Sequence, residues 1–207
     1  MDYKGKIINF MSNNSDTITS DEISKLNIPR ITMTRLIESK TIERIKTGLY
    51  VLSGGWGDEY FNLIYGNKNA VFSHLTSLYF QDLCERVPIE YDITVKQNYS
   101  GSLIGNPNVK LYYANDTIYN IGLISIKSPQ GRIVPCYDVE RCLCDLIKYK
   151  DQIYIEYLKY AFNEYYKVQK NDVKKLYEYA KKLNVYDKIK EFMEVFSWLI
   201  LLVLKQK

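Results

Sequence analysis

The spacing of apolar positions divides the first 52 residues into helical stretches followed by short strands. It predicts three helices, over residues 3–14, about 20–26 and about 30–39. In the third, Met33, Leu36 and Ile37 lie three and four positions apart, so one face points to a core. Two strand-like runs, 42–45 and 49–52, then flank a turn that contains Gly48, a residue free to take the positive φ of a hairpin.

Helix-start residues support these boundaries. Thr19 and Glu22 have the spacing of a capping box, in which each side chain satisfies a free backbone donor. Pro29 suits the beginning of the third helix, because the N–H that proline lacks would be unpaired there.

The order helix, helix, turn, helix, hairpin predicts a winged helix-turn-helix domain over residues 1–53. Such domains place the second helix of the motif in the major groove of DNA. The candidate DNA-binding residues lie on the third helix and the hairpin: Arg30, Thr32, Thr34, Arg35, Lys40, Arg44, Lys46 and Thr47. The alternative is a three-helix domain of the same order that binds only protein.

The glycine-rich stretch 53–57 marks the boundary with a second domain, residues 57–207. A strand, glycines and a helix also occur in phosphate-binding loops. The full glycine pattern and the Lys-Ser/Thr pair of those loops are absent here, which favours a linker.

The second domain has a mixed pattern. A helix over 58–66, a short strand at 70–72 and a helix over 74–86 precede strand-like patterning from 88 to 137. A helix from about 138 and three more over 152–167, 171–183 and 186–204 follow. We therefore expect an α+β fold, with a small sheet and C-terminal helices. The apolar end of the last helix, 197–204, needs a cover from this chain or from another.

Two side-chain groups in this domain admit a catalytic or a structural interpretation. Ser73 and His74 resemble a nucleophile and base, but adjacent residues seldom face each other, so we expect the Ser73 hydroxyl to cap the following helix. Asp138 suits a helix N-cap, and Arg141 and Asp145 have the spacing of an ion pair on one helix face. We expect Asp138, Arg141 and Asp145 to be structural.

Charge and composition limit the possible chemistry. The net charge is +2 over residues 1–52, −3 over 53–147 and +5 over 148–207, so anionic partners suit the two ends. Four cysteines and a single histidine at position 74 lack the spacing of a metal site, and we expect no metal and no cofactor. The start of the chain lacks a signal-peptide pattern, and the longest apolar run is about half the ~20 residues of a membrane helix. We expect a cytoplasmic protein with no membrane partner.

Three segments resemble the AbiEi antitoxins of the AbiE abortive-infection systems, which serve in phage defence. They are the winged-helix segment 28–52, the segment 70–83 and the segment 134–148. The second is similar to the family's Ser-His-x-Ser-Ala-Leu helix start but has Thr76-Ser77-Leu78. The third is similar to its Glu-Arg-Thr-Leu-x-Asp-Leu pattern but has Cys142 in place of threonine.

The resemblance implies a type IV antitoxin that is also a transcription repressor. Its winged helix would bind double-stranded DNA at repeats in its own promoter, with self-association on DNA. Its second domain would neutralise a nucleotidyltransferase-like toxin, an activity that does not require a stable complex with it. The lysine-rich helices near the C-terminus offer a surface for this activity, with Lys174, Lys175, Lys181 and Lys182 in pairs seven residues apart.

Two other classes remain open. One is a winged-helix regulator that senses a small ligand and has no antitoxin role. The other is an enzyme, such as a nucleotidyltransferase or a nuclease. The missing Gly-Ser and Asp-x-Asp signature and the single histidine disfavour the enzyme.

Overall fold

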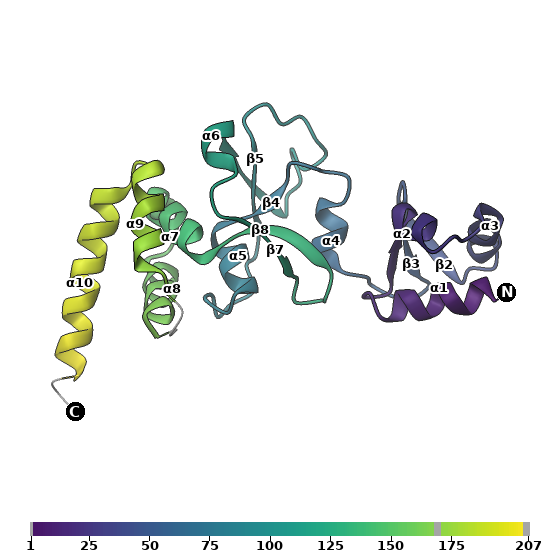
Figure 1. Cartoon of the computed structure of the whole chain (residues 1–207), viewed down its shortest axis with the longest axis horizontal. Coiled ribbons are helices and arrows are strands. Elements are labelled where there is room, and N and C mark those ends of the chain that lie inside the picture. The colour runs from purple at the N-terminus through teal and green to yellow at the C-terminus, as the bar shows by residue number, and fades with distance from the viewer. Residues whose placement is uncertain (1, 168–170, 205–207) are drawn as a thin grey trace. The chain divides into compact units, whose positions relative to one another are not determined.

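The computed structural model describes the backbone of residues 2–167 and 171–204 and side chains as far as Val195 (Figure 1). The chain forms two compact units. The first comprises residues 1–68 and 127–134, and the second comprises residues 69–126 and 135–207. Helices and two small sheets combine in an α+β fold, which confirms the predicted class.

The first unit contains a winged helix. Its elements are α1 Tyr3–Ser12, β1 Thr17–Thr19, α2 Ser20–Lys25, α3 Arg30–Glu38, β2 Ile42–Lys46 and β3 Leu49–Leu52. The three helices and the β2–β3 hairpin agree with the predicted elements. Strand β1 was not predicted; it pairs with β3, so that the antiparallel sheet has the order β1-β3-β2.

Local chemistry accounts for the turns of this domain. The Thr19 hydroxyl accepts a 3.2 Å hydrogen bond from the Glu22 amide, and the Glu22 carboxylate accepts one of 2.8 Å from the Thr19 amide. These two bonds are the predicted capping box. Gly48 has a φ of +78°, and a Cβ there would lie 3.0 Å from the Tyr65 hydroxyl. Gly48 therefore meets both a conformational and a steric requirement of the hairpin.

The units divide elsewhere than at the predicted 53–57 boundary, because two further segments, 57–68 and 127–134, belong to the first unit. The Arg132 guanidinium group lies 2.8 Å from the Glu22 carboxylate of α2, and buried Asp58 holds the two segments to each other. Asp58 caps α4 (Glu59–Ile64) by accepting a 2.9 Å hydrogen bond from the Phe61 amide. The same carboxylate accepts hydrogen bonds from the Ser128 hydroxyl and, at 3.0 Å, from the Arg132 amide. A buried carboxylate requires such partners, so residues 57–68 and 127–134 stay together.

The second unit is built on most of a five-stranded mixed sheet of order β6-β5-β4-β8-β7. Its strands are β4 Val71–Phe72, β5 Tyr91–Lys96, β6 Val109–Ala114, β7 Leu123–Lys127 and β8 Ile133–Tyr137. Strand β4 runs antiparallel to β5 and parallel to β8, and β5 runs parallel to β6.

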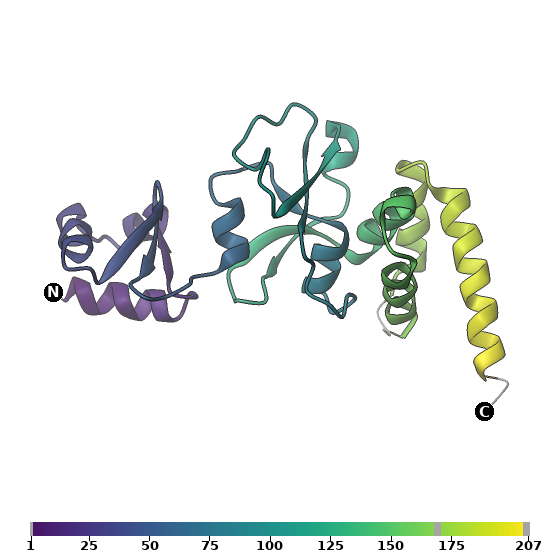
Figure 2. The same cartoon turned by 180° about the vertical axis from the view of Figure 1, so that it is seen from behind.

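The helices of this unit surround α7, which is buried along most of its length. The helices of the unit, α7 included, are α5 His74–Phe80, α6 Asp116–Tyr119, α7 Val139–Lys148, the 3₁₀ turn Lys150–Gln152, α8 Ile155–Lys167, α9 Val173–Lys182 and α10 Tyr186–Leu204. Helix α7 packs against α5, α8 and α9, and α10 packs along α9 (Figure 2). Helix α5 ends before the predicted residue 86, and Asp82 in the following turn has a φ of +60°.

Over the described residues, no helix has the length and apolarity needed to cross a membrane. The side chains of the apolar segment 197–204 lie outside the described part of the chain, so the prediction that they are covered stays a prediction.

Candidate nucleic-acid interface

Helix α3 presents a basic outer face. Met33 and Leu36 are buried in the core of the first unit, whereas Arg30, Thr34 and Arg35 are exposed. Thr32 is half-buried at the edge of this face. The helix begins after Pro29, whose side chain makes no capping hydrogen bond. The positive end of the α3 dipole and the Arg30 guanidinium group therefore occur together at an exposed surface, an arrangement that suits phosphate oxygens. Arg35 adds a second exposed guanidinium group in the last turn of the helix.

The residues predicted to contact the DNA backbone differ in their surroundings. Lys40, Arg44 and Thr47 are exposed. Lys46 is engaged within the unit, because its ammonium group donates hydrogen bonds of 2.5 Å to the Asn62 carbonyl and 3.2 Å to the Leu63 carbonyl. Burial lowers the pKa of Lys46. Lys46 thus stabilises the end of α4, and we leave it out of the interface.

The four lysines of the predicted antitoxicity surface also differ in exposure and in their contacts. Lys174, Lys181 and Lys182 are exposed on α9. Lys175 is half-buried and bridges the carboxylates of Asp138 at 2.9 Å and Glu140 at 3.0 Å. Burial opposes its charge, but the hydrogen bonds to these two carboxylates hold the pKa of Lys175 above its ordinary value. Lys175 therefore links α9 to α7, and the other three lysines stay exposed, with the Lys181 ammonium group 5.1 Å from the Tyr186 ring centroid.

Arg141 lies at the centre of a buried structural network. Its Nε lies 2.9 Å from the Asp145 carboxylate, so the predicted ion pair is present. Its Nη1 donates to the carbonyls of Ile118 and Ile121 at 2.5 and 2.9 Å, and the guanidinium lies 4.3 Å from the Tyr137 ring centroid.

Asp138 caps α7, accepting a 3.0 Å hydrogen bond from the Arg141 amide. The hydrogen bonds of Arg141 to the Ile118 and Ile121 carbonyls join α7 to the segment before β7. The Arg141 side chain is 2% exposed.

Ser73 does not cap α5, contrary to the prediction. Its hydroxyl lies 2.9 Å from Nδ1 of His74, and the cap comes instead from Asp92 on β5, which accepts a 3.1 Å hydrogen bond from the Leu75 amide. The backbone of His74 has a φ of +46°, which brings the two adjacent side chains together. The expectation that these adjacent side chains do not meet is therefore wrong.

This contact belongs to a buried polar cluster around Asp92. The Tyr112 hydroxyl donates to Asp92 at 3.1 Å, and the Tyr112 ring stacks on His74 with centroids 3.6 Å apart. Burial raises the pKa of Asp92 to about 6 and, together with Arg141, holds the pKa of His74 well below its ordinary value. His74 Nε2 has no hydrogen-bond partner within the described residues. The sequence did not indicate this cluster, because Asp92 and Tyr112 lie in separate strands.

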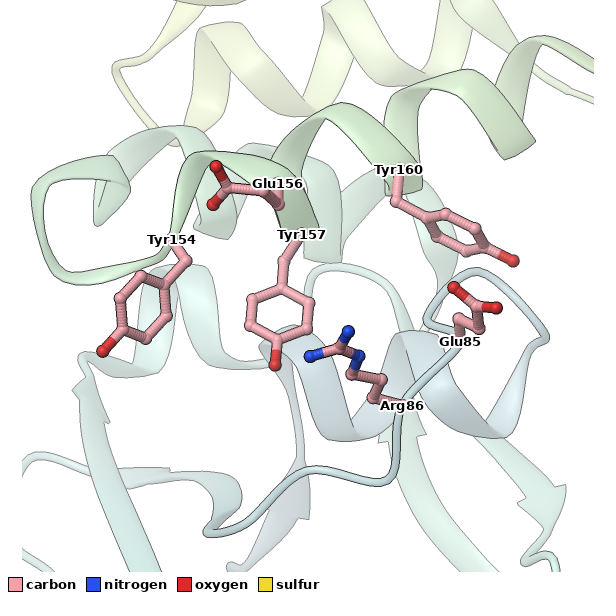
Figure 3. A pocket seen from close by; sticks show the side chains of 6 residues that line it. All are labelled: Glu85, Arg86, Tyr154, Glu156, Tyr157 and Tyr160. Carbon is pink, nitrogen blue, oxygen red and sulfur yellow. The ribbon is translucent and has the colours of Figure 1, made fainter.

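A cavity of about 440 Å³ opens beside the start of α8. Tyr157 and Tyr160 point toward the segment that carries Glu85 and Arg86, and Tyr154 lines the end of the cavity away from that segment (Figure 3). A neighbouring cavity of about 180 Å³ shares Arg86, Tyr154 and Tyr157 with it, and its lining also includes residues of the Asp92 cluster. Aromatic walls with a few charged groups are typical of small-molecule sites.

Within the described ranges, 2–167 and 171–195, no group of three or more His, Cys, Asp or Glu side chains is placed to bind a metal ion. All four cysteines are free and buried.

Comparisons with known proteins leave the family of this chain open. No protein family matches the chain, and no curated protein matches it. Among solved structures, the crystal structure of the RV2827C protein from Mycobacterium tuberculosis is similar over 87% of this chain and 75% of that chain, with 9% identity and a TM-score of 0.44. A likeness this weak does not establish a common fold, and we base no argument on it.

Proposed function

We propose that this protein is a cytoplasmic DNA-binding repressor and antitoxin of an AbiE-type operon. The observation that carries the DNA-binding part is the outer face of α3, where exposed Arg30 lies at the uncapped beginning of the helix and exposed Arg35 lies in its last turn. The order of elements in the first unit is that of a winged helix, and the winged helix supplies a groove-reading helix in many repressors.

In this proposal the exposed side chains of α3 enter the major groove. Arg30 and Arg35 contact guanine edges or nearby phosphates, and an arginine–guanine pair contributes ~1–3 kcal/mol of discrimination. Lys40, Arg44 and Thr47 hold the phosphate backbone and fix the register without reading sequence. Repeats in the promoter bring two copies of the chain onto the DNA.

The antitoxin part rests on the resemblance to the AbiEi family. Three exposed lysines of α9, Lys174, Lys181 and Lys182, give the second unit a cationic surface that suits an acidic partner or a nucleic acid. We assign toxin neutralisation to this surface, with no catalytic role for the chain.

Gel-shift titration of the full chain on a duplex from its own promoter tests DNA binding. We expect wild type and Lys4→Ala, a control on the exposed part of α1, to shift the promoter duplex at lower protein concentration than a scrambled duplex. The double variant Arg30→Ala, Arg35→Ala should lose this preference while unfolding at the wild-type temperature. A wild-type protein that shifts both duplexes equally would refute a sequence-specific repressor.

Co-expression with the protein encoded immediately downstream tests the antitoxin role. Once that protein alone is shown to be toxic, the wild-type chain should restore colony formation. Charge reversal at Lys174, Lys181 and Lys182 should abolish rescue. Reversal at three other exposed lysines of the same unit should preserve it; the control positions are Lys148, Lys159 and Lys188. Failure of the wild-type chain to rescue would contradict the antitoxin role.

The cavities of the second unit favour a second candidate, a ligand-sensing winged-helix regulator with no antitoxin role. The larger cavity has the volume of a drug-sized ligand site and three tyrosines in its lining. This candidate predicts that a small-molecule extract of the host cell changes promoter affinity of the wild type but not of Tyr157→Ala. A lack of any such change, together with toxin neutralisation, would favour the antitoxin.

A further inference from the structure

An apolar side chain occupies the middle of the basic face of α3. Ile31 is 56% exposed, and the described core of the first unit is formed by other residues, among them Met33 and Leu36 of the same helix. On a helix, Ile31 neighbours Thr34 at three positions and Arg35 at four, and Thr34 neighbours Arg30 at four. Ile31 and Thr34 therefore lie side by side, with an arginine one turn from each.

Thr34 adds to the apolar character of this centre. Its hydroxyl lies 3.4 Å from the Arg30 carbonyl and can donate back to its own helix. The methyl group is then the part of Thr34 that is left for an external partner. The centre of the face therefore presents the Ile31 side chain and the Thr34 methyl group, and the guanidinium groups of Arg30 and Arg35 lie at its edges.

Charge decides which partner such a face accepts. Arg30 and Arg35 flank the apolar centre, and exposed Lys40 and Arg44 follow in the same domain. Exposed Glu38, one turn after Thr34, is the acidic residue of this face, and the cationic side chains outnumber it. A polyanion with apolar groups at its recognition surface fits this combination. Duplex DNA is such a partner, because thymine carries a C5-methyl group in the major groove and the other three bases present none.

We propose that Ile31, together with the methyl group of Thr34, reads thymine methyl groups in the major groove. This assignment rests on the proposed DNA-binding function and makes it more specific. Arg30 and Arg35 contact the guanine edges or phosphates on either side, and the Ile31–Thr34 pair selects a thymine between them.

Uracil substitution removes the methyl group and leaves the pairing edge of the base intact. The binding site is first selected from random duplexes with the wild-type chain, and it is then synthesised with thymine or with uracil throughout. Fluorescence anisotropy gives the affinity of each duplex for the wild type, Ile31→Ala, Thr34→Ser and a matched control, Ile133→Ala. Ile133 is also 56% exposed and lies in the first unit outside the winged helix.

We expect the wild type and Ile133→Ala to bind the uracil duplex at least about fourfold more weakly, the effect of losing one buried methyl group. Ile31→Ala should bind the thymine duplex more weakly than the wild type does, and its difference between the two duplexes should shrink to the part that the Thr34 methyl group supplies. Thr34→Ser should show a reduced difference. Thermal unfolding of each variant at the wild-type temperature shows that the fold is retained.

Two other outcomes overturn the assignment in distinguishable ways. Specific binding that is the same for thymine and uracil, or a thymine preference that is as large in Ile31→Ala as in the wild type, refutes the role of Ile31 and leaves DNA binding intact. Failure to select any duplex refutes the DNA-binding function, and the assignment fails with it.

Discussion

The ammonium group of Lys46 donates a 2.5 Å hydrogen bond to the carbonyl oxygen of Asn62, near the end of α4. A residue that the sequence assigns to the DNA-contacting wing therefore stabilises the first unit from within. A lysine can hold the domain together or contact the DNA backbone, and charge alone does not distinguish these two roles.

Lys46→Met keeps the length of the side chain and removes its charge and its hydrogen bonds. We expect a loss of about 1–2 kcal/mol in the free energy of unfolding by urea, because two carbonyl oxygens lose a charged donor. The salt dependence of DNA binding should not change. Lys40→Met should do the reverse, lowering the slope of log affinity against log salt by about 0.9 at wild-type stability. A lower slope in Lys46→Met would return this lysine to the interface.

The buried Arg141–Asp145 pair predicts a large effect on stability. Arg141→Ala leaves a carboxylate buried and two carbonyl groups without their donor, so we expect a loss of about 3–5 kcal/mol. Lys190→Ala removes one partner of the exposed Lys190–Glu194 pair and should cost less than about 1 kcal/mol. Equilibrium unfolding in urea measures both. Equal stability of Arg141→Ala and wild type, with toxin neutralisation lost, would show a functional role instead.

Lys175 and Lys174 are adjacent in sequence and should respond differently to the same change. Lys175→Met breaks contacts to Asp138 and Glu140, so it should lower the melting temperature. Lys174→Met, at an exposed position, should leave the melting temperature unchanged. Thermal unfolding followed by circular dichroism compares the two. If both variants melt like the wild type, Lys175 does not link α9 to α7 in solution.

Asp92 predicts a pH dependence of stability with a definite sign. Its pKa in the folded protein is raised from 3.8 to about 6, so the folded state retains a proton that the unfolded chain releases. This contribution to stability is complete below pH 3.8 and is lost as the pH rises through 6. The free energy of unfolding of Asp92→Asn, relative to wild type, should therefore increase by about 2–3 kcal/mol between pH 4 and pH 7.

His74, stacked on Tyr112, acts in the opposite direction over the same range. Its pKa is lowered, so its contribution is present above 6.5 and is lost as the pH falls. Because His74 is present in both proteins, the difference between Asp92→Asn and wild type isolates the carboxyl group. A difference that stays constant from pH 4 to pH 7 would contradict the raised pKa of Asp92.

Local patterns predicted the winged helix well. The spacing of Met33 and Leu36, the capping box at Thr19 and the turn at Gly48 each depend on residues close in sequence, and the structure agrees with all three. Ile37, the third residue of the predicted core face, is instead 38% exposed. The sequence pattern does not predict the three-residue strand β1, because it is too short to show an alternation of apolar and polar positions. Its pairing with β3 is a long-range contact that local spacing does not encode.

The polar contacts of the two units could not be predicted in this way. Asp58 meets Arg132 from 74 positions away, and Asp92 meets Tyr112 from a neighbouring strand. Buried carboxylates collect whichever donors the fold brings to them, so their partners follow from topology. For the same reason Ser73 was assigned a cap that Asp92 provides, and Lys46 and Lys175 were assigned to surfaces from charge alone.

The specificity of α3 for DNA is the claim on which this account depends most. We would measure the affinities of the wild type and Arg35→Ala for the promoter duplex and for a scrambled duplex at matched salt. The account predicts that Arg35→Ala weakens promoter binding by about 10- to 100-fold and changes scrambled-duplex binding far less, since a base contact is worth ~1–3 kcal/mol. A folded Arg35→Ala that retains the wild-type ratio of the two affinities would contradict it.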